Sequence, residues 1–165
     1  YDSQEPWYQW EVLVSKENIL KNVQQLLPEV KEVQRVEIVE KGEGDAVLHL
    51  KVETEQGAKS FYSEYDIRSV LAPLGVEIIR QDGSSVKGGK LLPSAYFTME
   101  EQTDTAGVWT GYQIKGGGYG HGVGMSQNGA KGMADTGKNY QEILNYFYNE
   151  VELGQVQDVV KKENP

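Results

Sequence analysis

The side chains best suited to chemistry gather in one glycine-rich run, residues 116–130. Five of its glycines surround Tyr119 and His121: Gly116, Gly117, Gly118, Gly120 and Gly122. Glycines carry no side chain, so they leave space around the two rings and let a ligand approach the backbone. Ser126 and Gln127 follow at an expected helix start, where backbone N–H groups lack partners within the helix. Together these groups suit an uncharged sugar chain, bound by ring stacking and neutral hydrogen bonds.

The alternative for this run is a tight turn around a buried histidine. A turn needs one or two glycines, whereas this run places five beside a tyrosine and a histidine. We therefore favour a binding site.

A second glycine pattern is similar to a phosphate-binding loop but departs from it. Residues 132–139 match the first seven positions of that motif, and Asn139 stands where a Ser or Thr hydroxyl would hold magnesium. The stretch also follows an expected helix rather than a buried strand. We interpret Gly137 as the end of one helix and Asn139 as the cap of the next. A dinucleotide-binding fingerprint is absent as well, because no glycine pair at i, i+2 in residues 116–124 has a third at i+5.

Metal ligands are scarce in this sequence. His49 and His121 are its histidines, and it has no cysteine. A structural zinc site needs four ligands and a catalytic site typically three, so we predict no metal or cofactor site within this chain. His49 is expected to be a half-exposed residue of a strand. The alternative for His121 is that it supplies one ligand to a site completed by residues outside the chain.

Glycosidic bond cleavage uses carboxyl groups, of which the chain has many. Nothing in the sequence marks one of them as buried or paired, so we name no catalytic acid. The acidic residues considered were Glu64, Asp66, Glu100, Glu101 and Asp104.

Length and charge limit the classes of function. The 165 residues suffice for one compact domain, and the net charge is −9. The chain has three arginines and no cluster of cations, which excludes a nucleic-acid-binding surface. No apolar run approaches the roughly 20 residues of a spanning helix. Because the chain begins with Tyr1 rather than Met, we interpret it as a piece of a longer protein.

The periodicity of apolar residues predicts an α+β fold, with one main antiparallel sheet, several packed helices and the glycine-rich loop lining a cleft. The first half should hold a strand, a helix from Ser15 to Pro28 and a three-stranded meander in which Leu48, Leu50 and Val52 share one face. The segments expected in order are strand 7–14, helix 15–28, strands 35–39, 46–52 and 59–62, helix 63–71, a polar loop 81–90, a hairpin of 95–100 with 108–114, and helices 125–134 and 139–147. Residues 161–165 should form a frayed tail.

Residues 118–134, GYGHGVGMSQNGAKGMA, resemble the signature of the stage II sporulation protein D (SpoIID) family, also called the amidase-enhancer family. The resemblance continues, in the family's order, through residues 6–10, 66–69, 92–97 and 140–148. Asn128 replaces an aromatic residue common in the family, and Tyr119 stands where Trp is common. The chain is thus either one domain, residues 1–165, or the C-terminal portion of a SpoIID-type domain.

The resemblance implies a portion of a peptidoglycan lytic transglycosylase that cuts denuded glycan strands during sporulation. It also implies an extracytoplasmic place, at the cell wall or anchored to the membrane through a missing N-terminal segment. The implied partners are glycan strands, a cell-wall amidase or other sporulation proteins, and the N-terminal half of the same domain. The substrate-binding residues implied here are Tyr119, Gly120, His121, Gly122, Gly124, Ser126 and Gln127.

The family's catalytic glutamate and its zinc ligands lie upstream of the part that matches this chain. Whether the chain belongs to an enzyme is therefore open, and zinc is expected only in the longer parent. Two alternatives remain. One is a non-catalytic wall-binding or amidase-activating module, and the other is a structural fragment that folds only with its other half.

Overall fold

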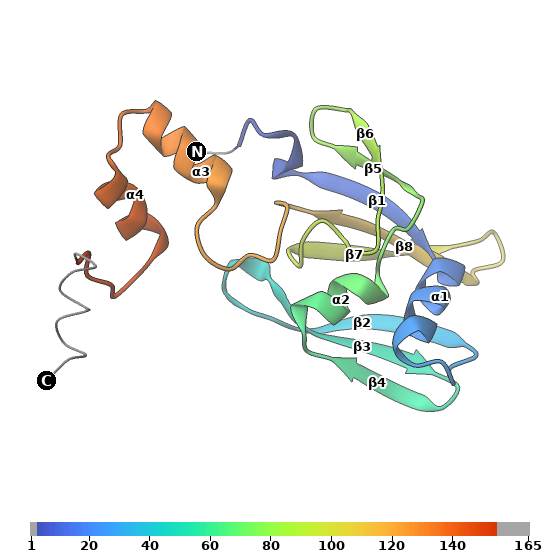
Figure 1. Ribbon diagram of the computed structural model, residues 1–165. Helices are drawn as coiled ribbons and strands as arrows, with labels where there is room; N and C mark the ends of the chain where they lie inside the picture. The colour runs from blue at the N-terminus through green and yellow to red at the C-terminus, as the bar shows by residue number, and fades with distance from the viewer. Residues whose placement is uncertain (1–2, 155–165) are drawn as a thin grey trace, which may run out of the picture. The chain divides into compact units, whose positions relative to one another are not determined.

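The computed structural model describes residues 3–154, so the expected tail at 161–165 lies outside the described residues. The chain forms two compact units (Figure 1). We call residues 5–122 the sheet unit and residues 123–154, with residues 3–4, the helical unit. The predicted α+β class is confirmed, with antiparallel sheets and helices. Whether the chain is one domain or part of a larger one stays a prediction.

The sheet unit contains two antiparallel sheets rather than the one that was predicted. The larger sheet has the order β6-β5-β1-β8-β7 and the smaller has the order β2-β3-β4. The strands are β1 (Trp10–Ser15), β2 (Val33–Lys41), β3 (Val47–Thr54), β4 (Gly57–Phe61), β5 (Glu77–Arg80), β6 (Ser85–Lys87), β7 (Phe97–Thr103) and β8 (Trp109–Gly116). The expectation of one sheet was wrong because β1 pairs with the distant β5 and β8, which leaves the meander as a sheet of its own.

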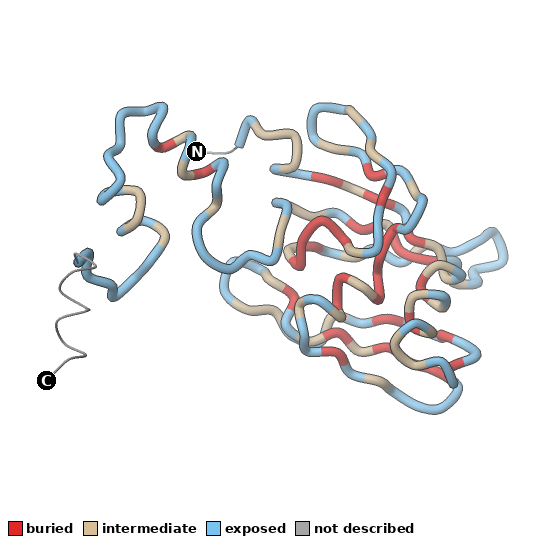
Figure 2. The backbone as a smooth tube through the Cα atoms, in the orientation of Figure 1, coloured by how far each residue is buried: buried red, intermediate tan, exposed pale blue. Residues whose placement is uncertain are grey.

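Two helices pack against these sheets. Helix α1 (Lys16–Leu26) contacts β1 and β8 of the larger sheet and β2 of the smaller, and α2 (Glu64–Val70) contacts β3 and α1. Figure 2 shows the buried residues concentrated along the strands and helices of this unit. The core is mainly β-branched and leucine side chains, among them Val12, Val14, Ile19, Leu50, Ile67 and Ile114, all 2% exposed or less.

The hydroxyl of Tyr112 links the two sheets. It accepts a hydrogen bond from the Val36 N–H at 3.0 Å and donates one to the Val36 carbonyl at 2.8 Å. Val36 lies on β2, at the edge of the smaller sheet, whereas Tyr112 lies on β8 of the larger. One side chain therefore satisfies both backbone groups of a buried residue on an edge strand.

Helices α1 and α2 begin at the residues where the sequence predicts helices to begin. Ser15 caps α1 by accepting from the Asn18 N–H, and Ser63 caps α2 in the same way from Asp66. The first strand was predicted from residue 7, but Pro6–Tyr8 form a 3-10 turn, η1, and β1 begins at Trp10. Proline suits the first position of such a turn because its φ is already helical.

Two other details of the strands differ from expectation. Leu48 is 45% exposed instead of sharing a buried face with Leu50 and Val52. The partner strand is irregular between Ile38 and Lys41, opposite this part of β3, and such a bulge shifts the alternation of faces. The expected loop at 81–90 contains β6, which pairs with β5 around the Asp82–Gly83 turn. Its three residues, Ser-Val-Lys, are too few to show a period.

A second short 3-10 turn, η2 (Glu43–Asp45), lies in the sheet unit between β2 and β3. The helical unit contains two further helices. Helix α3 (Gln127–Asp135) begins after Ser126, and α4 (Tyr140–Phe147) begins after Asn139, whose side chain forms a capping box with Glu142. Gly137 directly follows the end of α3, so the interpretation of residues 132–139 as a helix end and a cap is confirmed. Among residues 3–154, no helix combines the length and apolarity needed to cross a membrane.

Candidate functional site

The glycine-rich run begins where β8 ends, beside the central strand β1. Trp10 pairs with Gly116 in register, and its indole ring packs on that glycine: a Cβ built on Gly116 would lie 2.2 Å from the ring. The Trp10 Nε1–H donates to the Gly118 carbonyl at 3.0 Å. A buried tryptophan thus fixes both the start of the run and the direction in which it leaves the sheet.

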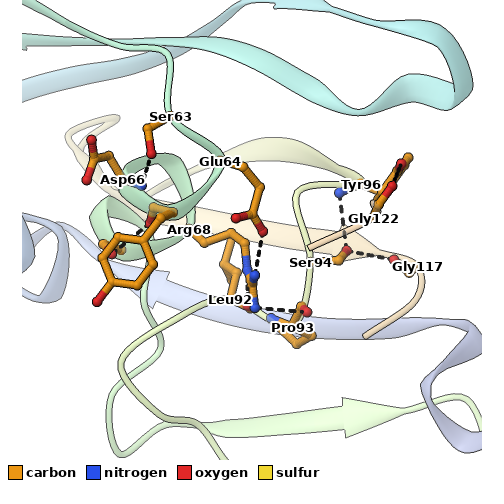
Figure 3. A network of polar contacts seen from close by, with 12 residues as sticks. Ser63, Glu64, Asp66, Arg68, Leu92, Pro93, Ser94, Tyr96, Gly117 and Gly122 are labelled. Atoms are coloured by element: carbon orange, nitrogen blue, oxygen red, sulfur yellow. Dashed lines mark hydrogen bonds and ion pairs between the residues drawn. The ribbon is translucent and has the colours of Figure 1, made fainter. Parts of the chain in front are cut away.

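A second anchor comes from the segment before β7. The Ser94 hydroxyl donates to the Gly117 carbonyl at 2.6 Å, and the Gly120 N–H donates to the Pro93 carbonyl at 2.8 Å. The Gly117 N–H donates to the Tyr96 carbonyl at 3.0 Å. Figure 3 shows Ser94 between Tyr96 and Gly117. These bonds hold the run from the side opposite Trp10's strand.

Arg68 in turn supports this segment. It lies on α2, is only 9% exposed, and donates from Nε to the Leu92 carbonyl at 2.8 Å and from Nη2 to the Pro93 carbonyl at 3.3 Å (Figure 3). Its Nη1 pairs with the carboxylate of Glu64, one turn earlier on the helix. A planar guanidinium presents five donors in a fixed fork, so it can hold these three acceptors in a defined geometry. A chain of contacts therefore connects α2 through Pro93 to Gly120.

Tyr119 projects from the run and is 71% exposed. Its ring lies 4.8 Å from the ring of Trp7, centroid to centroid, at an angle of 42°. The Gly118 N–H donates to the Trp7 carbonyl at 2.9 Å, which ties the two segments together. The guanidinium of Arg80, on β5, lies 5.4 Å from the centroid of the Trp7 ring. We call Tyr119, Trp7 and Arg80 the stacked trio.

The predicted site residues divide between the two units. Tyr119, Gly120, His121 and Gly122 follow β8 in the sheet unit, with His121 exposed, which excludes the alternative of a buried histidine. Gly124, Ser126 and Gln127 belong to the helical unit, where the Ser126 hydroxyl accepts from the Gly129 N–H as the cap of α3. The cleft expected along the run, and a shared site of these residues, stay predictions.

Comparison with known proteins now places the chain in a family. A family model described as a domain of unknown function, DUF8618, matches residues 1–124. The chain belongs to this family. It is also 43% identical over 61 residues to the amidase enhancer of Bacillus subtilis (strain 168), a match that covers 37% of this chain and 8% of the relative.

Two further relatives are longer matches. The stage II sporulation protein D of Bacillus subtilis (strain 168) is 35% identical over 86 residues, 49% of this chain and 23% of the relative. An uncharacterized protein of Brachyspira hyodysenteriae is 39% identical over 89 residues, 54% of this chain and 23% of the relative. The predicted relationship to the SpoIID and amidase-enhancer family is confirmed. The chain spans less than a quarter of the length of these relatives.

Four carboxyl groups of this DUF8618 chain have a shifted pKa, and in each the shift is opposite to the one that a general acid needs. Hydrogen bonds lower the pKa of Glu37 (from Lys51), Glu55 (from the Lys31 N–H), Asp82 (from Ser84) and Glu142 (from Lys138). A general acid needs the opposite shift, because it must stay protonated near neutral pH.

Two of the acidic residues considered from the sequence have structural roles. Glu64 neutralises Arg68, and Asp104 accepts from the N–H groups of Ala106 and Val108 in the turn between β7 and β8. Their carboxylates are therefore engaged in holding the fold rather than directed at a ligand.

His49 is half-buried, as expected. Its Nε2 lies 2.9 Å from the Ser60 hydroxyl, and its ring stacks on Tyr62 at 4.4 Å. Within residues 3–154, no three His, Asp or Glu side chains gather as metal ligands would.

Sequence reasoning missed Trp7, Arg68 and Arg80 as parts of the site. Trp7 was assigned to a strand, Arg68 lay in the similar segment 66–69 without a role of its own, and Arg80 preceded a loop expected to be polar. The available signal was indirect: the acidic chain has only three arginines, of which Arg80 lies over Trp7 and Arg68 binds the Pro93 carbonyl that Gly120 also contacts.

Proposed function

We propose that this chain is the glycan-binding part of a longer protein that acts on peptidoglycan, and that the longer protein is a lytic transglycosylase. The observation that carries the proposal is the exposed Tyr119 ring beside Trp7, at the base of a run of glycines held on two sides. Flat aromatic faces bind the apolar faces of sugar rings, and backbone groups bared by glycine supply neutral hydrogen bonds. The names of the relatives, a sporulation protein and an amidase enhancer, agree with this role.

In this proposal the chain binds and orients the glycan, while a carboxylic acid outside the chain performs the chemistry. That acid would give its proton to the glycosidic oxygen as the bond to the anomeric carbon breaks. The 6-hydroxyl of the same sugar would then attack the anomeric carbon and return its proton to the carboxylate. The product is an anhydro sugar, and no water is consumed.

The same proposal also gives the binding partners of the protein and its cellular location. They are denuded glycan strands, the preceding part of the same domain, and a cell-wall amidase or other sporulation protein, all outside the cytoplasm. Any zinc would be held by the longer protein.

Binding to denuded glycan strands tests the proposal directly. We expect Tyr119→Ala to weaken binding roughly 5- to 10-fold, because a stacked ring contributes about 1 kcal/mol beyond its buried area. Tyr65→Ala is the matched control, since Tyr65 is an exposed tyrosine on α2 outside the stacked trio. Equal binding by both variants and the unchanged chain would contradict the proposed site.

His121 is tested in the longer protein. Muropeptide analysis of denuded strands should show less anhydro product after His121→Ala. An unchanged yield would remove His121 from the substrate-binding residues.

The second candidate is a non-catalytic module that binds the wall and activates an amidase. One relative is named an amidase enhancer, which favours this candidate. Strand binding without anhydro product in the longer protein, together with faster amidase turnover, would decide for this candidate.

A further inference from the structure

A pocket of about 640 Å³ lies in the sheet unit where β1, β5 and β8 meet. It forms because β1 pairs with β8 over six residues but with β5 over only two, so β5 and the turn after it stand apart from the central strands. Gln81 ties this turn to the chain before β1, since its N–H donates to the Gln9 carbonyl at 2.9 Å. Trp10 and Gly116 line the pocket, so it adjoins the start of the glycine-rich run.

Two cations, Arg80 and Lys115, line this pocket in a chain of net charge −9. The ion pairs found among residues 3–154 involve neither of them. The Arg80 Nε donates to the Ser84 hydroxyl at 2.9 Å, and its guanidinium lies over Trp7. These two contacts fix the plane of the guanidinium, so little side-chain entropy is lost when it binds a planar anion.

One carboxylate also lines the pocket. Glu11 is the cross-strand partner of Lys115, and it accepts a weak hydrogen bond from Gln113 at 3.4 Å. The ionisable side chains of the lining thus sum to one positive charge. Asp82, whose carboxylate accepts from the Ser84 hydroxyl beside Arg80, lies outside the lining and reduces this charge, so the pocket suits a single carboxylate better than a doubly charged phosphate.

We propose that this pocket binds the carboxylate of an acidic sugar in the glycan, with Arg80 and Lys115 as its ligands. Trp7 connects the pocket to the exposed aromatic face, because its ring contacts Tyr119 on one hand and Arg80 on the other. A glycan stacked on the aromatic pair therefore has a cation beside it. The inference rests on the proposed function for the identity of the polymer. In peptidoglycan the matching group is the lactyl carboxylate of the muramic sugar, which is free only where no stem peptide is attached to it.

The test compares two forms of one polymer: denuded glycan strands, and the same strands with their carboxylates converted to primary amides. We expect the full chain to bind the acidic strands at least roughly 10-fold more tightly, because hydrogen bonds to a charged group are stronger than those to a neutral one. Raised salt should reduce this difference.

Variants then locate the preference. Arg80→Gln and Lys115→Gln should each bind the two polymers almost equally, whereas Lys87→Gln should keep the preference, since Lys87 is an exposed cation on β6 that does not line the pocket. Retained binding of the amidated strands shows that a variant is folded. No preference in the unchanged chain, or a preference that survives Arg80→Gln, would overturn the inference.

The outcomes separate the two proposals. Binding that depends on Tyr119 but ignores the carboxylate leaves the proposed function standing and removes the pocket. A carboxylate preference that depends on Arg80 but not on Tyr119 keeps the pocket and removes the aromatic site. Failure to bind either polymer would refute both.

Discussion

Arg68 connects α2 to the glycine-rich run through the carbonyl groups of Leu92 and Pro93, the second of which also accepts from the Gly120 N–H. We expect Arg68→Ala to lower the free energy of unfolding by about 2–4 kcal/mol, because it removes the guanidinium from the buried Leu92 carbonyl and the Glu64 carboxylate, and one of two donors from the Pro93 carbonyl. Urea denaturation would measure this. Lys21→Ala, at an exposed position of α1, is the control and should change little.

A second measurement distinguishes whether Arg68 holds the glycine-rich run in place or only stabilises the fold in general. Amide hydrogen exchange at Gly117 and Gly120 should accelerate in Arg68→Ala more than exchange in the meander of β2 to β4. Uniform acceleration across the sheet unit would show that Arg68 stabilises the fold without holding the run in particular.

Glycine is required at position 116 because the Trp10 ring lies directly against its Cα. A methyl group there would overlap the Trp10 ring, so Gly116→Ala should cost about 1–3 kcal/mol and shift the tryptophan fluorescence. Gly89→Ala is the matched control, since a Cβ at Gly89 meets no atom within 4 Å. If both variants unfold at the same urea concentration, Trp10 does not fix the start of the run.

Gly118 and Gly120 have a different requirement, since their φ angles are +75° and +129° and a Cβ would meet no atom within 4 Å. Backbone conformation therefore explains glycine at these two positions, and the open space beside them is where the proposed glycan would approach. The glycines of the run therefore serve the path of the backbone as well as the open space around the two rings.

At the scale of the elements, Tyr112 links β8 of the larger sheet to β2 of the smaller sheet. We expect Tyr112→Phe to destabilise the sheet unit by about 1–2 kcal/mol, since both backbone groups of Val36 lose their partner. Thermal or urea denaturation measures the loss. Tyr62→Phe, on an exposed ring, should be neutral and serves as the control.

The same hydroxyl makes stability depend on pH. Burial raises the pKa of Tyr112 above its ordinary value, so the folded state holds this proton more tightly than the unfolded state does. The contribution is complete below about pH 10, the ordinary tyrosine pKa, and is lost as the pH rises above it. The difference in unfolding free energy between the unchanged chain and Tyr112→Phe should therefore narrow above that pH. A constant difference would contradict this account.

The elements that depend on residues close together in the sequence could be predicted. The caps at Ser15 and Asn139, the meander and the hairpin of β7 with β8 each follow from residues within a few positions of one another. Strand β6 was not predictable because its three residues are too few to show a period. The division into two sheets was not predictable because it depends on β1 pairing with strands more than 60 residues away. In the candidate site, Tyr119 and His121 were marked by their glycines, but Trp7 joins them only through the fold.

For the whole molecule, the division into two units leads to a prediction about independent folding. Every buried hydrophobic residue among those described, except Met133, lies in residues 5–122, and α4 has no buried residue. A chain of residues 5–122 should therefore unfold in one cooperative transition close to that of the full chain, as circular dichroism would show. Residues 123–165 alone should show no cooperative transition. A non-cooperative sheet unit would favour the interpretation of the chain as a structural fragment.

The central place of β1 also has a consequence for the order in which the protein is made. Trp10 pairs with Gly116 and Ser15 with Gly111, so the first strand has its longest partner about 100 residues later. During synthesis β1 can pair with β5 over two residues, but its other edge lacks a partner until residues 109–116 of β8 have been made. Closing so long a loop slows folding, and exposed strand edges aggregate in the meantime. The larger sheet is thus completed only when synthesis reaches Gly116, where the glycine-rich run begins, so that β1 and the start of the run become ordered together.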